Sequence, residues 1–131
     1  MSKIRVQYHF RKTETGINAW NVQKLIELST ELPIKKIDPR EIVEVDQNHW
    51  YFHNPKLIPT PRSVIEHIRL IQDCDLDHPI ILDHNGRVMD GMHRICKALL
   101  ENAPEVLAVQ FTVDPEPDFI DCSPEDLPYD V

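Results

Sequence analysis

The residues best suited to chemistry lie in one short run, Asp90-Gly91-Met92-His93-Arg94. Arg94 carries a planar guanidinium whose parallel N–H groups match two phosphate oxygens, and His93 adds a further donor. Gly91 has no Cβ, so a ligand can come close to the backbone there. This combination predicts a phosphate-binding turn, in which Asp90 either orients the turn or serves only as a helix N-cap.

The segments on either side place this run at the beginning of a helix. Residues 79–82 and 88–89 are predicted as the strands of a hairpin, because Asn85-Gly86 between them tolerates positive φ. Residues 93–101 show the helical spacing of apolar side chains. The start of a helix has unpaired backbone N–H groups and partial positive charge, so it favours a bound anion.

Two other helix starts are marked by capping residues, Asn21 and Thr60-Pro61. A short polar side chain accepts from first-turn amides, and proline at the first helical position loses no hydrogen bond. The pattern predicts strands over 3–10 and 106–113, an extended segment over 34–45 and a loop over 46–59. It predicts helices over 22–29 and from 60 to about 73. The second helix has Val64, Ile65, Ile68 and Ile71 at helical spacing.

Several further motifs accompany the turn. They are Ala19-Trp20, Glu44-Val45-Asp46, His49-Trp50-Tyr51-Phe52 and His67. With them the chain resembles the stand-alone ParB-like proteins of the ParB/sulfiredoxin superfamily. The resemblance implies a single α+β domain, with a mixed sheet and flanking helices. This domain would span residues 1–113, including an N-terminal strand–helix extension, and be followed by an acidic, proline-rich tail over 114–131.

The resemblance also implies a ligand for the turn. In this superfamily the matching turn holds nucleotide phosphates, and free-serine kinases carry the similar sequence Asp-Gly-His-His-Arg. The implied cofactor is a nucleotide (ATP, ADP or CTP) with Mg²⁺, its phosphates cradled by Gly91, Met92, His93 and Arg94. Lys97 lies one helical turn beyond His93 and either reaches a phosphate or is an ordinary surface lysine.

A phosphotransferase or hydrolase also needs a base near the transferred phosphate. The family's catalytic glutamate matches the region of Glu44 and Asp46, with Glu41 as a register alternative; either residue would act as base or Mg²⁺ ligand. Asp90 is a third catalytic candidate, orienting the turn or a metal-bound water. The rival hypothesis is a non-catalytic regulatory or binding module, and the sequence leaves open whether the protein is an enzyme.

At two points the chain departs from the family's pattern, and each departure excludes one of the family's functions as an expectation for this chain. Met92 stands where sulfiredoxin has its reactive cysteine, and a thioether cannot take over the chemistry of a thiolate. The helix-turn-helix domain of the partition proteins is replaced by an acidic tail. The tail carries seven acids and no Lys or Arg, and the rest of the chain has 15 acids against 14 Lys and Arg. Duplex DNA is therefore not expected as a partner.

Composition is that of an ordinary globular domain, with 41% hydrophobic and 27% charged residues in 131. The chain has no apolar run near the ~20 residues that span a bilayer and no signal-peptide core, so a cytoplasmic protein is expected. Three widely spaced cysteines predict reduced thiols, and the histidine spacings match no zinc pattern. The expected partner is a small molecule or nucleotide, with a homodimer left open.

The tail is predicted to do more than solubilise the protein. Four prolines prevent a regular helix, yet apolar side chains recur through it at Phe119, Ile120, Leu127 and Tyr129. A purely solvating tail would not require them. We therefore expect it to run along the domain or a second subunit, held by these side chains.

Overall fold

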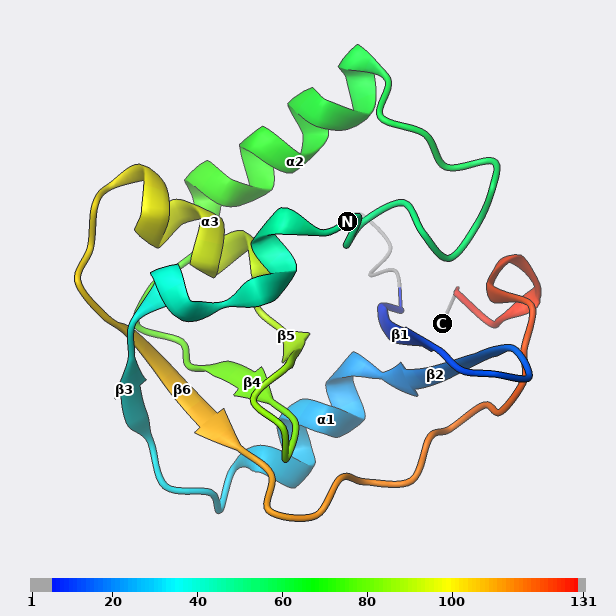
Figure 1. The fold of residues 1–131 in the computed structure, drawn as a ribbon, viewed down its shortest axis with the longest axis horizontal. Helices are drawn as coiled ribbons and strands as arrows, with labels where there is room; N and C mark the ends of the chain where they lie inside the picture. The colour runs from blue at the N-terminus through cyan, green and yellow to red at the C-terminus, as the bar shows by residue number, and fades with distance from the viewer. Residues whose placement is uncertain (1–5, 130–131) are drawn as a thin grey trace, which may run out of the picture.

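The fold is α+β, as predicted, and consists of a hairpin, a four-stranded sheet and three α-helices (Figure 1). The computed structural model describes residues 6–129. The elements are β1 (Tyr8–Lys12), β2 (Ile17–Asn21), α1 (Val22–Ser29), β3 (Lys35–Ile37), η1 (Pro39–Glu41), η2 (Val43–Asp46), α2 (Pro61–Asp73), β4 (Ile80–Leu82), β5 (Val88–Asp90), α3 (Met92–Leu100), β6 (Val106–Gln110) and η3 (Pro124–Asp126), where η denotes a 3-10 helix.

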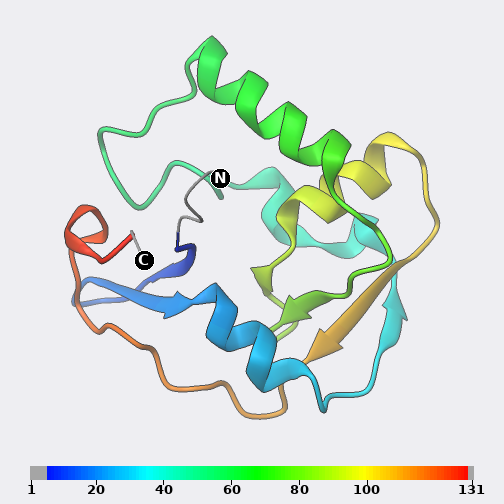
Figure 2. The same cartoon turned by 180° about the vertical axis from the view of Figure 1, so that it is seen from behind.

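The four-stranded sheet has the order β3-β6-β4-β5, with β4 and β6 parallel and the other two pairs antiparallel. Its central strand β4 is buried on both faces. Ile80 and Leu82 pack towards α3, whereas Ile81 points to the opposite face, where Trp20 and Leu25 lie. The alternation of side chains along a strand therefore explains why three consecutive apolar residues are needed here. Figure 2 shows α1 across the second face.

The predicted helix starts at Asn21 and Thr60 are confirmed. The side chain of Asn21 accepts a hydrogen bond from the Lys24 backbone N–H at 3.2 Å, and that of Thr60 accepts from the Ser63 N–H at 3.2 Å. Pro61 occupies the first turn of α2. Local capping chemistry thus sets where both helices begin.

Several sequence predictions differ from the structure. Of the strand predicted over 3–10, residues 3–5 lie outside the described range, and the observed strand is Tyr8–Lys12. The strand predicted over 106–113 ends at Gln110. Strand β2 was not predicted; it pairs with β1 immediately before α1. The extended segment predicted over 34–45 is a strand only at Lys35–Ile37 and then becomes two 3-10 helices. The chain turns at Pro39, which has no N–H to give to a sheet, while the Asp38 side chain accepts from the Arg40 N–H at 2.9 Å.

The acidic tail lies along the N-terminal hairpin, in agreement with the prediction that it follows the domain. The Ala19 N–H donates to the Phe119 carbonyl at 2.9 Å, and the Trp20 indole N–H donates to the Pro115 carbonyl at 2.9 Å. Leu127 is 9% exposed, whereas Ile120 is 66% exposed and does not hold the tail in place. Backbone pairing contributes alongside the apolar side chains.

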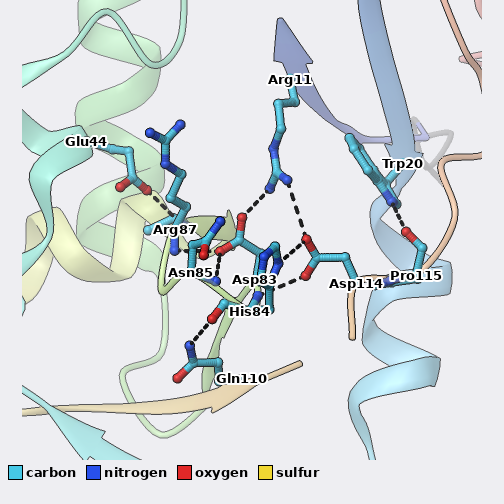
Figure 3. A network of polar contacts seen from close by, with 11 residues as sticks. Arg11, Trp20, Glu44, Asp83, His84, Asn85, Arg87, Gln110, Asp114 and Pro115 are labelled. Carbon is cyan, nitrogen blue, oxygen red and sulfur yellow. Dashed lines mark hydrogen bonds and ion pairs between the residues drawn. The ribbon is translucent and has the colours of Figure 1, made fainter. Parts of the chain in front are cut away.

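A buried carboxylate joins the hairpin, the sheet and the tail (Figure 3). Asp83, which is fully buried, accepts from the Asn85 and Arg87 backbone N–H groups at 2.8 and 2.9 Å. Its other oxygen lies 2.7 Å from the Arg11 guanidinium of β1. The same guanidinium lies 3.7 Å from Asp114, at the start of the tail. One arginine therefore links three separate parts of the chain.

Among the described residues, no helix is both long enough and apolar enough to cross a bilayer. The three cysteines are free and partly exposed, and burial raises the pKa of the Cys96 thiol. Reduced thiols were the expectation from the sequence.

Breaking the buried ion pair should cost far more stability than breaking an exposed one. We expect Asp83→Asn to lower the free energy of unfolding by about 3–5 kcal/mol, because Arg11 then loses its closest partner. The matched control is Asp38→Asn, which breaks an exposed pair with Arg40 and should leave stability nearly unchanged. Urea denaturation measures both, and equal losses would contradict the assignment.

The tail provides a second comparison, between a buried and an exposed apolar residue. Leu127→Ala should lower stability by about 2 kcal/mol, because burial of its side chain is lost. Ile120→Ala should leave the melting temperature within error of the wild type. Thermal unfolding followed by circular dichroism tests this; a melting temperature unaffected by Leu127→Ala would show that the side chain does not anchor the tail.

Candidate functional site

The predicted turn has the geometry of a strand-to-helix junction. Strand β5 ends at Asp90, and α3 begins at Met92. Gly91 between them has φ of 116°, a backbone conformation that favours glycine. A Cβ at this position would also lie 2.5 Å from the Cγ2 of Ile80. Both the backbone conformation and the lack of space for a Cβ therefore require glycine at this position. The first turn of α3 begins without a side-chain cap.

Arg94 crosses the turn and is held there by two acceptors. Its guanidinium donates to Asp90 Oδ2 at 2.9 Å and to the His78 carbonyl at 3.4 Å. The side chain is only 16% exposed. Arginine has five N–H donors, so these contacts orient the guanidinium and leave further donors for a ligand. The negative charge of Asp90 compensates the positive charge of Arg94.

The turn lines a cleft of about 360 Å³, which we call the α3 cleft. Its lining residues come from the segment before β1, α1, the end of α2, the loop after α2 and the turn: Gln7, Val22, Ile26, Leu70, Asp73, Cys74, Asp75, His78, Asp90, Gly91, His93 and Arg94. A second hollow of about 520 Å³, the apolar trough, shares Ile26, His78, Asp90 and Arg94 with it. Ile34, Ile81 and Val109 are among the remaining trough residues. Arg94 stands where the two meet.

Two acidic residues are among the cleft residues that sequence reasoning missed, Asp73 and Asp75. They lie at and just beyond the end of α2, and they reach the cleft only because α2 packs against α3. The sequence signal was an acid pair around Cys74 next to a helix end, which is common at solvent-exposed helix ends. Only packing between segments about 20 residues apart distinguishes it from such a surface pair.

His93 belongs to a stacked aromatic group. Its Nε2 lies 2.8 Å from Nδ1 of His67, and one of the two rings donates to the other. Trp50 stacks on both rings, with centroid distances of 4.0 Å to His67 and 5.1 Å to His93. Burial, followed by the neighbouring His67, His49 and Arg94, lowers the pKa of His93 to about 4. His93 is therefore a neutral imidazole at pH 7.

The predicted phosphate-binding residues Met92 and Lys97 are not among the residues that line the α3 cleft. Met92 is 5% exposed and packs in the core beneath α3 instead. The ammonium of Lys97 donates to the Gln72 and Cys74 carbonyls at 3.0 and 2.8 Å. It thus satisfies the C-terminal carbonyls of α2. Lys97 is absent from the lining of the α3 cleft.

The candidate carboxylates Glu44 and Asp46 lie apart from the α3 cleft. Glu44 is 8% exposed, and its Oε2 accepts from the Val88 N–H at 2.6 Å, so it ties η2 to β5. Glu44 borders a hollow of about 200 Å³, which no sequence pattern predicts. The other lining residues are His9, Phe10, Arg11, Lys12, Gln47, Asn48, His49, Phe52, Arg87 and Val88. Asp46 is exposed, as is the register alternative Glu41.

Within residues 6–129, one group of three possible metal ligands has its ligand atoms within 4.8 Å of one another: Asp83, His84 and Asp114. The Arg11 guanidinium pairs with both of these carboxylates. It already supplies the positive charge that a metal ion would bring. The His84 backbone N–H donates to Asp114 at 2.8 Å, and the cluster fits a structural role.

Comparison with known proteins identifies no relative: no family model, no curated protein and no solved structure matches the chain. The ParB-like resemblance therefore stays a prediction from the sequence.

The low pKa of His93 predicts how the free energy of unfolding depends on pH. In the unfolded chain its pKa is near 6.5, so as pH falls from 6.5 to about 4 only the unfolded state gains this proton. The free energy of unfolding should fall over that window, and more steeply in the wild type than in His93→Gln. Histidine NMR titration should place His93 near pH 4.

Trp50→Ala is the companion variant, because it removes the indole that covers the two imidazoles. We expect the pKa of His93 to rise towards 6.5 in this variant, as water reaches the ring. A wild-type His93 that titrates near 6.5 would contradict the described environment.

Proposed function

We propose that the protein binds a phosphorylated small molecule in the α3 cleft, with a nucleotide as the first candidate. The observation that carries the proposal is the uncapped first turn of α3, with Gly91 and the Arg94 guanidinium at the cleft. Backbone N–H groups at a helix start and an arginine fork are both suited to phosphate oxygens. The volume of about 360 Å³ is in the range of small-molecule sites.

The body of the ligand would extend into the apolar trough. The trough joins the cleft at Asp90 and Arg94, and aliphatic side chains such as Leu32, Ile34 and Val109 line it. A phosphate held by the turn would therefore leave the rest of the molecule against an apolar surface. This arrangement favours a ligand with one charged end and one less polar end.

Charge supports a role for Mg²⁺. Asp90 already compensates Arg94, and Asp73 and Asp75 add further negative charge to the cleft. A phosphate group arriving alone would meet these three carboxylates. Carboxylate oxygens are suited to Mg²⁺, which commonly binds one or two of them together with substrate phosphates. When bound, the ion would neutralise phosphate charge in the ground state and during any transfer.

A reaction at this site would need a base close to the phosphate. Glu44 and Asp46 do not line the α3 cleft, whereas the neutral imidazole of His93 does. The Nε2 of His93 is hydrogen-bonded to His67, and burial together with His67 lowers the pKa of His93 to about 4, so it would be a weak base at neutral pH. The alternative is a non-catalytic binding module, favoured by the hydrogen bond of Glu44 to the Val88 N–H. Phosphate release in a hydrolysis assay with Mg²⁺ separates the two.

The binding proposal is tested with ATP, ADP, CTP and inorganic phosphate, each with and without Mg²⁺, by calorimetry. We expect Mg²⁺ to increase nucleotide affinity in the wild type. Asp90→Asn should bind the metal-free ligand more tightly, because a repelling carboxylate is removed and Arg94 loses its intramolecular partner. The same variant should lose part of the Mg²⁺ effect.

Arg94→Lys completes the test. A lysine cannot replace two parallel hydrogen bonds, so affinity should fall roughly tenfold or more with and without Mg²⁺. Arg69→Lys is the matched control, since Arg69 is exposed on α2 and lines neither the cleft nor the trough. Unchanged affinity in Arg94→Lys, or no binding by any of the four ligands, would overturn the proposal.

A further inference from the structure

The hollow of about 200 Å³ beside Glu44 is separate from the candidate site, and we call it the Glu44 hollow. It shares no lining residue with the α3 cleft or the apolar trough. Three segments enclose it: β1, the end of η2 with the loop that follows, and the residues at the start of β5. At about 30 Å³ for each water molecule, its volume corresponds to roughly seven waters. This is enough space for one small metabolite.

Positive side chains outnumber negative ones around the Glu44 hollow, although the whole chain has 22 acids and 14 Lys and Arg. Arg11 is compensated by the two carboxylates that it faces outside the hollow. Lys12 and Arg87 are exposed, and neither belongs to an ion pair found within residues 6–129. Figure 3 draws no contact to the Arg87 guanidinium. These two cations against the carboxylate of Glu44 leave one positive charge in excess.

The two histidines of the hollow do not change this balance. Burial, followed by the charges of Arg11 and His49, lowers the pKa of His9 to about 3. Burial also lowers the pKa of His49. Both imidazoles are therefore neutral at pH 7. The excess positive charge belongs to Lys12 and Arg87.

Glu44 provides a hydrogen-bond acceptor that the protein itself uses only in part. The side chain is 8% exposed, and its Oε2 accepts from the Val88 N–H. For Oε1, no hydrogen bond or ion pair is found within residues 6–129. Buried polar atoms in native proteins almost always have a partner. Oε1 is therefore suited to a donor that a bound molecule supplies, such as a hydroxyl group.

Amides and aromatic rings make up much of the remaining lining. The Oδ1 of Asn48 accepts from the Tyr51 N–H at 3.2 Å, which leaves the amide N–H groups of Asn48 as donors. Gln47 adds a second, exposed amide, and Phe10 and Phe52 add aromatic surface. Amides and a carboxylate can hydrogen-bond the hydroxyl groups of a sugar ring, while aromatic rings cover its less polar faces.

We propose that the Glu44 hollow binds a sugar acid, a single sugar ring that carries a carboxylate. The carboxylate pairs with Lys12 and Arg87, and the fork of a guanidinium can hold both of its oxygens. The hydroxyl groups donate to Glu44 and exchange hydrogen bonds with the amides. A carboxylate matches one excess positive charge, whereas a phosphate ester carries about two negative charges at pH 7. The proposal is independent of the ligand of the α3 cleft.

NMR titration of the isotope-labelled full chain with D-glucuronate tests the proposal, because it measures weak affinities and locates the bound molecule. D-glucose supplies the hydroxyl groups without the charge, and acetate supplies the charge without the hydroxyl groups. We expect glucuronate to bind roughly tenfold or more tightly than either. Its shifts should centre on the Val88 N–H. Shifts centred on Gly91 instead would place the anion in the α3 cleft and overturn the proposal.

Arg87→Gln tests the pairing of charges. It should weaken glucuronate binding roughly tenfold, because a hydrogen bond between charged groups is lost. The fold should persist, since the side chain has no printed contact to lose and its backbone bonds to Asp83 remain. Arg62→Gln is the matched control, because Arg62 is exposed on α2 and outside the lining. It should bind glucuronate as the wild type does.

Glu44→Gln tests the recognition of hydroxyl groups and keeps an oxygen for the Val88 N–H. It should lower the ratio of glucuronate to acetate affinity several-fold; the change in charge affects both ligands and cancels in the ratio. An unchanged melting temperature would show that this variant folds, and Arg87→Gln is the test that does not alter a buried group. No binding of glucuronate, equal affinity for glucuronate and acetate, or an unchanged affinity in Arg87→Gln would each overturn the proposal.

Discussion

The rest of the structure depends on the buried carboxylate of Asp83. A charge without water contact is tolerated only when its neighbours replace the lost hydration. Here two backbone N–H groups of the β4–β5 turn and the guanidinium of Arg11 do so. The same guanidinium also faces Asp114, so the hairpin, the sheet and the beginning of the tail meet at one ionic cluster.

The contacts of Asp83 also position the candidate site, because β5 connects the two. The strand runs from the turn that Asp83 organises to Asp90, and the phosphate turn follows directly. Glu44 holds the beginning of the same strand through the Val88 N–H. Gly91 then fits against Ile80 of β4 with no space for a side chain. The position of Arg94 at the cleft is therefore a consequence of a short, firmly held hairpin.

Features that depend on near neighbours were predictable. The caps at Asn21 and Thr60, the turn at Asn85-Gly86 and the glycine before α3 each rest on a few consecutive residues, and the structure contains all of them. Strand β2 was missed because the pattern before α1 is short and its partner is β1. The segment after Ile37 was called extended because its apolar residues are compatible with a strand, whereas Pro39 turns it.

The sequence by itself determined the helix starts and the strand–glycine–helix turn, because capping and positive φ are properties of local chemistry. Only the tertiary structure decided which side chains share a cleft. The Lys97 ammonium donates to a carbonyl at the end of α2, Glu44 is buried against β5, and Asp73 lines the cleft. The exposure of Ile65 likewise follows from which side of α2 meets the domain. These outcomes depend on contacts between distant segments, and no local pattern encodes which of several compatible partners a side chain will meet.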